Sequence, residues 1–327
     1  MKYIDIPTTQ NELLPFYLAA EEYVAKYVEE DECFFMWQVD PTVIFGRNQL
    51  IENEVNLEFC KSHGIRTFRR KSGGGCVYAD RSNIMFSYIN SSDSVQFTFD
   101  RYIRMVAFLL QKLGLDAHAS NRNDVLIGNR KVSGNAFYHI PGRNIVHGTM
   151  LYDTNMENMV GSITPSNEKL VSKGVESVRQ HITLLKDYLT IGIEEFKQFI
   201  RDNLCDSTLL LTEKDVQKIR EIEQEYYTPE FIYGNNPRYT IKNKVRIDGC
   251  GHFEISIEVK NNVIKKINLM GDYFLCGDLD KGLLQRLTNV EYSREAIEKA
   301  LEGVNTEEYI LHLTKDALID MIITKTL

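Results

Sequence analysis

The order of apolar and polar residues divides the chain into helical and strand-forming stretches. Apolar side chains recur at helical spacing from Leu14 to Val28, so residues 14–29 are predicted to form an amphipathic helix. Residues 98–113 are predicted to form a second helix. The strands predicted on either side of Asp40-Pro41, which are given in the next sentence, are expected to pair with each other through a turn. In chain order, short apolar runs predict strands at Cys33–Val39, Thr42–Phe45, Ile65–Phe68 and Asn83–Ile89.

The middle of the chain predicts a dense β region. Two separators, Gly128-Asn129-Arg130 and the stretch from Pro141 to Asn144, consist of residues that favour turns. We therefore expect a three-stranded antiparallel meander, with Lys131 at the start of one strand and His147 on the next. Its strands are Asp124–Ile127, Lys131–Ile140 and Ile145–Tyr152.

The C-terminal third has a different character. Turn residues dominate 228–238, which we interpret as a linker or cover segment. Strands with a hairpin at Asn261-Asn262 and three helices follow. We expect an α+β protein with a catalytic domain at 1–245 and a small α+β domain at 246–327. The helices are predicted at 193–204, 213–227, 279–288, 293–302 and 314–325, and the strands at Tyr239–Ile247, His252–Val259 and Val263–Leu269.

Charge limits the classes of partner. With 38 basic and 46 acidic residues the formal net charge is −8, which argues against a nucleic-acid-binding protein. Basic residues nevertheless cluster in 60–81 and 122–147. Such clusters indicate either a local anion-binding site or solvent-exposed loops. The six cysteines form no C-x-x-C pair, and the start MKYIDIPTTQ has neither a signal-peptide pattern nor an apolar span. We expect a cytoplasmic protein with reduced thiols and no membrane partner.

Arg69–Tyr78, with the sequence RRKSGGGCVY, is the most informative segment. Consecutive glycines can adopt positive φ and turn backbone N–H groups toward an anion, and the preceding cations add charge where a phosphate would lie. The segment is neither a P-loop nor a dinucleotide fingerprint. A glycine turn with incidental basic neighbours is the alternative.

Two further segments carry candidate chemistry. Lys131 precedes a strand with small residues at Ser133, Gly134 and Ala136, which would leave room for a ligand. A surface lysine in a hairpin is the plainer interpretation. His147, in HGTML, is either a base or a buried structural histidine.

Taken together, RRKSGGGCVYAD, RNDVLI, RKVSGNA, HGTML and SKGVESVRQHIT resemble lipoate–protein ligase of the A type, in this order and at these distances. YGNNPRYT looks like the junction to that family's accessory domain. The resemblance implies a mixed, mainly antiparallel sheet of the biotin/lipoate ligase type, like that of class II aminoacyl-tRNA synthetases. It also implies an ATP- and Mg²⁺-dependent enzyme that forms lipoyl-AMP from (R)-lipoate. The lipoyl group then passes to a lysine of an apo lipoyl domain, on a 2-oxoacid dehydrogenase E2 subunit or the glycine-cleavage H protein.

The resemblance also assigns roles to residues. Lys131 matches the family lysine that contacts the lipoyl carbonyl and the phosphate, and Asp124 is a candidate magnesium contact. Gly134, His147 and Gly148 are expected to line the lipoate pocket, near Val77. The remaining residues expected at the nucleotide are Arg70, Ser72, Gly73, Gly74, Gly75, Cys76, Val77, Tyr78 and Asn123.

The chain departs from the family pattern at Ala79, where many members have histidine, and Cys76 is unusual within the loop. One alternative is an octanoyl or lipoyl amidotransferase of the same fold that uses a cysteine nucleophile and no ATP. A second is a lipoate-binding protein whose activating function has decayed. Biotin ligation fits the motifs less well than either. Sequence alone does not decide the preferred acceptor, the choice of lipoate or octanoate, or the oligomeric state.

Overall fold

The computed structural model describes residues 1–8, 12–49, 51–92, 94–120, 123–163, 181–233, 241–260 and 263–323. The chain forms two compact units, each described separately below. The first comprises Met1–Phe45, Ile51–Arg70 and Cys76–Ile232, and the second Gly46–Leu50, Lys71–Gly75 and Tyr233–Leu327.

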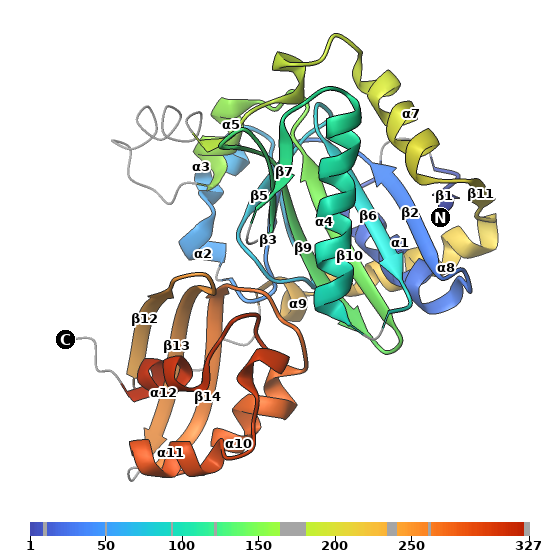
Figure 1. Cartoon of the computed structure of the whole chain (residues 1–327). Helices are drawn as coiled ribbons and strands as arrows, with labels where there is room; N and C mark the ends of the chain where they lie inside the picture. Colours follow the sequence, from blue (N-terminus) through green and yellow to red (C-terminus); the bar gives the residue numbers. More distant parts are fainter. Residues whose placement is uncertain are drawn as a thin grey trace. The chain divides into compact units, whose positions relative to one another are not determined.

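An eight-stranded mixed sheet forms the centre of the first unit, in the order β11-β1-β2-β6-β10-β9-β8-β7 (Figure 1). Its pairs are antiparallel except β1 with β11 and β1 with β2, which confirms the mixed, mainly antiparallel sheet. The strands are β1 (Lys2–Asp5), β2 (Glu32–Trp37), β6 (Ile84–Asn90), β7 (Ala117–Ala119), β8 (Asp124–Ile127), β9 (Arg130–Ile140), β10 (Arg143–Met150) and β11 (Ser207–Leu210).

The expected meander is confirmed as β8, β9 and β10, because glycine turns bring neighbouring strands together locally. The expected pairing of the two strands around Asp40-Pro41 is wrong. β2 pairs with β1 and β6, whereas β3 (Thr42–Phe45) lies in a separate sheet between β4 (Arg66–Arg69) and β5 (Val77–Ala79). Proline fixes φ and removes a donor at this point, so the chain leaves one sheet and enters another.

Two helices cover opposite faces of the large sheet. Tyr17 of α1 (Leu14–Tyr27) stacks on Trp37 of β2, with ring centroids 4.9 Å apart. On the other face, Tyr102 of α4 (Val95–Lys112) stacks on Tyr88 of β6. Odd-numbered residues of β2 therefore face α1, and even-numbered residues face α4.

The remaining described helices of the first unit are shorter than α1 and α4. α8 (Glu213–Glu223) continues into a 3₁₀ turn at Gln224–Tyr227, so the expected helix at 213–227 is present in two parts. The expected linker at 228–238 begins as a helix, α9 (Pro229–Tyr233), and its residues 234–238 lie outside the described residues. The others are α2 (Ile51–Glu54), α3 (Leu57–Ser62), α5 (Met156–Ile163), a 3₁₀ turn at Leu185–Asp187, α7 (Ile193–Leu204) and α8 (Glu213–Glu223).

The second unit contains an antiparallel sheet with helices, as expected for the C-terminal domain. The boundary expected between residues 245 and 246 falls inside β12 (Ile241–Ile247). The hairpin residues Asn261-Asn262 lie outside the described residues, but β13 (Gly251–Lys260) and β14 (Val263–Asp272) pair as expected. The helices are a π-helical turn at Asp280–Leu284, α10 (Gln285–Leu287), α11 (Arg294–Ala300), a 3₁₀ turn at Thr306–Glu308 and α12 (Lys315–Ile323).

Across the described ranges, no helix is both long and apolar enough to span a bilayer. The same residues contain no group of three or more histidine, cysteine, aspartate or glutamate side chains arranged to hold a metal ion.

Candidate functional site

Lys131 and Asp124 meet on the meander. The Lys131 Nζ lies 2.7 Å from Asp124 Oδ1, and the two side chains are 36% and 25% exposed. A register shift between Val125 and Leu126 lets Lys131, at the start of β9, turn back over the strand. The pair thus presents a cation to solvent while a partly buried carboxylate fixes its position.

Gly134 makes room for the lysine. It pairs with Asp124 across the ladder, and a Cβ added at Gly134 would lie 2.7 Å from both Cε and Nζ of Lys131. That distance is shorter than van der Waals contact, so any other residue would displace the lysine. The glycine is needed here for space, because its φ is not in the left-handed region.

Asn123 and Asn135 tie the two strands beside the lysine. Each side-chain Nδ2 donates to the backbone carbonyl of the other, at 2.9 Å in both cases. Gly148 lies opposite Asn135 on β10, and a Cβ there would overlap Asn135 Oδ1. Asn123 and Gly148 therefore support the strands next to Lys131.

His147 belongs to a buried polar network. Its Nδ1 donates to the Glu21 carboxylate at 2.9 Å, and the two side chains are 6% and 0% exposed. Ser87 Oγ donates to Glu21 Oε1 at 2.6 Å and accepts from Trp37 Nε1 at 2.8 Å. The network holds His147 and Trp37 in fixed positions on the face of the sheet that packs against α1.

Replacing Ser87 with alanine should destabilise the protein by about 1–3 kcal/mol, because the buried Trp37 N–H and Glu21 carboxylate would each lose a partner. Urea denaturation of the variant measures this loss. Ser91→Ala is the matched control, since Ser91 Oγ donates to Asp31 in an exposed turn. A loss no larger than the control's would show that the network contributes nothing to stability.

The glycine loop lies in the second unit and contacts that unit's own residues. The Gly74 N–H donates to the Tyr273 carbonyl at 2.8 Å, and Gly74 has a φ of +84°. A Cβ at Gly73 would overlap the same carbonyl, and one at Gly75 would lie 2.9 Å from Asp272 Oδ2. Ser72 is fully buried. At least one N–H of the expected anion-binding turn is thus engaged by a protein carbonyl.

The residues flanking this loop belong to the first unit and lie beside or within its small sheet. Arg70 is buried, and its Nη1 donates to the Ile44 carbonyl at 2.9 Å. Tyr78 is also buried, and its hydroxyl accepts from Asn158 Nδ2 at 3.3 Å. Burial raises the pKa of the Tyr78 hydroxyl well above its usual range, so it stays neutral. Cys76 and Val77 are partly buried, and their side chains pack against two different apolar clusters.

Asp80 and Ala79 make contacts that stabilise the fold. The Asp80 carboxylate accepts from the backbone N–H of Ser82 at 2.9 Å and of Asn155 at 3.2 Å, which ties the turn after β5 to the segment before α5. Ala79 is 1% exposed and packs in the apolar cluster under α1. The departure from the family pattern at this position therefore lies in the core.

Sequence reasoning missed Glu21, Ser87 and Trp37. Glu21 could have been found from the sequence, because it lies among the apolar positions of the helix at residues 14–29. A charge buried there without a partner would be costly, so its position predicts a buried polar partner. The roles of Ser87 and Trp37 could not have been predicted from the sequence, because only the strand register brings them close to His147. The motif SKGVESVRQHIT lies outside the described residues except at its end.

Two family models match the chain. Residues 15–205 match the lipoyl protein ligase A/B catalytic domain, and residues 236–322 match the bacterial lipoate protein ligase C-terminus. The chain is 32% identical to lipoate-protein ligase LplJ of Bacillus subtilis, covering 93% of this chain and 95% of the relative. It is also 32% identical to lipoate–protein ligase 1 of Staphylococcus aureus, with the same shares covered.

Several solved structures have the same fold as this chain. Plasmodium falciparum LipL1, solved with lipoate, superposes with a TM-score of 0.73 at 21% identity over 98% of each chain. The bipartite ligase of Thermoplasma acidophilum, studied with its E2 lipoyl domain, gives a TM-score of 0.65 at 27% identity. It covers 73% of this chain and 98% of its own. A lipoate–protein ligase A solved with ATP gives 0.60 at 24% identity, over 71% and 98%.

Proposed function

We propose that this chain, which belongs to the lipoate–protein ligase family, activates lipoate with ATP at Lys131 and transfers the lipoyl group to a lysine of an apo lipoyl domain. The observation that carries the assignment of the site is the Lys131–Asp124 pair, held over Gly134 on the meander. It supplies one accessible, positioned cation on a strand with small neighbours.

The first step needs such a cation. A lipoate carboxylate oxygen bonds to the α-phosphorus of ATP, the bond to the bridging oxygen breaks, and pyrophosphate leaves. The carboxylate and the polyphosphate repel each other, so a fixed positive charge between them lowers the barrier. Lys131 is suited to this role because Asp124 already holds its ammonium in place before any substrate binds.

In the second step the acceptor amine attacks the acyl carbonyl, the C–O bond of the mixed anhydride breaks, and AMP leaves with the electron pair. The amine gives up its proton as the amide forms. The same ammonium can polarise the acyl carbonyl and stabilise the oxyanion. One residue thereby serves both steps, which is what the family resemblance assigns to Lys131.

The strand register supports a place for the lipoyl tail. Gly134, Thr149, Met85 and Trp37 form one row across β9, β10, β6 and β2. Three strand spacings cover roughly 14 Å, which suits an extended acyl chain with a terminal ring. We propose that the tail follows this row from Lys131 toward Trp37, beside His147, and that the apolar side chains select it.

Magnesium would be bound with the nucleotide. Asp124 offers a single, partly exposed carboxylate, which is the number of protein ligands that Mg²⁺ often takes when phosphates and water complete its shell. We propose Asp124 as that ligand. The ion would neutralise phosphate charge. Arg70 and the Ser72–Gly75 loop remain proposed nucleotide contacts, supported by the family resemblance alone.

One assay tests both which protein accepts the acyl group and whether lipoate or octanoate is preferred. Apo lipoyl domains of 2-oxoacid dehydrogenase E2 subunits and apo H protein are each incubated with the protein, lipoate or octanoate, ATP and Mg²⁺. We expect lipoate-dependent release of pyrophosphate and a mass increase on at least one acceptor. Neither would occur if the chain were a non-catalytic lipoate-binding protein.

A cysteine-dependent amidotransferase would behave differently. Burial raises the pKa of the Cys33, Cys60 and Cys205 thiols to about 11, so these stay protonated and weakly nucleophilic at neutral pH. Cys76 is the cysteine that the sequence singles out, and we expect Cys76→Ser to retain activity within about two-fold, because the proposed chemistry forms no thioester. The assay is lipoylation of an apo domain. Complete loss of activity, with transfer that needs no ATP, would favour the amidotransferase.

A further inference from the structure

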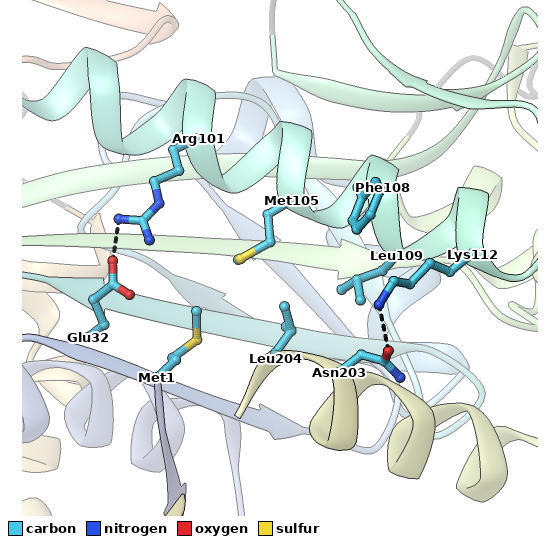
Figure 2. A pocket seen from close by; sticks show the side chains of 9 residues that line it. All are labelled: Met1, Glu32, Arg101, Met105, Phe108, Leu109, Lys112, Asn203 and Leu204. Atoms are coloured by element: carbon cyan, nitrogen blue, oxygen red, sulfur yellow. Dashed lines mark hydrogen bonds and ion pairs between the residues drawn. The ribbon is translucent and has the colours of Figure 1, made fainter. Parts of the chain in front are cut away.

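A groove of about 310 Å³ lies where α4 approaches α7 (Figure 2). Apolar side chains line it from three elements, with Met105 and Leu109 on α4, Leu204 at the end of α7, and Met1 beside β1. Phe108 of α4 also lines it and is 56% exposed. The volume is at the lower limit for small-molecule sites, so any ligand must be slender.

The two ends of the groove differ in charge. At one end Arg101 forms an ion pair with Glu32 (Figure 2). Glu32 also accepts a hydrogen bond from the Tyr88 hydroxyl at 3.0 Å. At the other end Lys112 Nζ donates to the neutral Asn203 Oδ1 at 2.9 Å and lies 5.4 Å from the centre of the Phe108 ring. Among the described residues, no acidic side chain pairs with Lys112. One end is therefore neutralised, and the other keeps its positive charge.

The groove is separate from the site at Lys131. Glu32 is an even-numbered residue of β2 and lies on the face that α4 covers. Gly134, Met85 and Trp37 lie on the opposite face, toward α1. A molecule in the groove would not touch Lys131.

We propose that this groove is a second ligand site, which binds a monocarboxylate with a linear alkyl chain. The carboxylate would pair with Lys112 and the chain would lie along Leu109, Met105 and Leu204. Met105 and Lys112 are seven residues apart on one helix, about 10 Å along its axis. The Arg101 guanidinium at the far end is already paired with Glu32, so a second carboxylate would lose hydration there without gaining a free cation, and the site disfavours dicarboxylates of the same length. This site is independent of the proposed ligase function.

Methyl NMR of protein labelled at its methionine methyl groups tests the proposal with nonanoate as the probe. Met105 lines the groove and Met85 lies on the other face of the sheet, so their signals separate the two sites. Substitution of each by leucine assigns them. We expect the Met105 signal to shift saturably with nonanoate. We expect about ten-fold weaker binding in Lys112→Met, through loss of a charge-assisted contact.

Arg104→Met is the matched control, because Arg104 is an exposed cation of the same helix that does not line the groove, and it should bind nonanoate as the wild type does. Nonanedioate should bind more weakly than nonanoate, because its second carboxylate finds no unpaired cation at the far end. Three results would each overturn the proposal: a Met105 signal that does not shift, unchanged affinity in Lys112→Met, or equal binding of nonanedioate. The remaining methionine signals report whether each variant is folded.

Discussion

Replacing Lys131 with alanine is expected to lower lipoyl transfer about a hundred-fold to a thousand-fold. The reason is the loss of the positioned ammonium proposed to act on the reacting groups, and removal of a single preorganised donor from a transition state commonly costs this much. Pyrophosphate release in the absence of acceptor measures the first step, and modification of a lipoyl domain measures both. Lys131→Arg should recover only part of the rate, since a broad planar guanidinium does not reproduce the compact ammonium that lies over Gly134.

The chain offers a matched control for this variant. Lys186 forms an ion pair with Asp153 at 2.7 Å, the same separation as in the pair at Lys131, but its side chain is 58% exposed. Lys186→Ala should therefore leave both steps unchanged. Similar losses in the two variants would mean that the Lys131 effect is a general effect of removing an ion pair, and the proposed role would be wrong.

Replacing Gly134 with alanine is expected to lower activity about ten-fold to a hundred-fold with little change in melting temperature. The added methyl group would lie 2.7 Å from Lys131 Nζ, so the flexible lysine must move while the backbone stays in place. A displacement of about 1 Å at a reacting centre can cost this much rate. Steady-state kinetics and thermal denaturation of the same preparation separate the two effects.

Gly192→Ala is the control for the glycine substitution. No heavy atom lies within 4 Å of a Cβ at Gly192, and its φ of −75° suits alanine. It should change neither rate nor melting temperature. If Gly134→Ala instead kept full activity, the position of the lysine over this strand would not matter for the reaction.

The sequence predicted best those parts of the fold that are local. The meander follows from turn residues next to each strand, and its register brings Lys131, Asp124 and Gly134 together. Strand partners that are distant in the sequence were not predictable. β1 and β11 are four residues each and pair in parallel, so neither shows a pattern strong enough to recognise.

The glycine loop shows the same limit at a candidate site. Its composition predicts an open anion-binding turn, and the alternative of a simple glycine turn remained possible. The structure places Gly73 and Gly74 against the Tyr273 carbonyl, far along the chain. That tight approach explains why glycine is required there for space. The loop's contact with nucleotide remains a prediction, whereas the position of Lys131 rests on geometry.

Lipoate is expected to be activated as an adenylate before it is transferred. A single-turnover reaction tests it directly, with the protein, lipoate, Mg²⁺ and ATP labelled at the α-phosphate, first without acceptor and then with an apo lipoyl domain added. We expect labelled lipoyl-AMP to accumulate on the protein, and then to disappear as AMP and lipoylated domain appear in equal amounts. Modification of the domain without any labelled adenylate would show that the protein does not activate lipoate in this way.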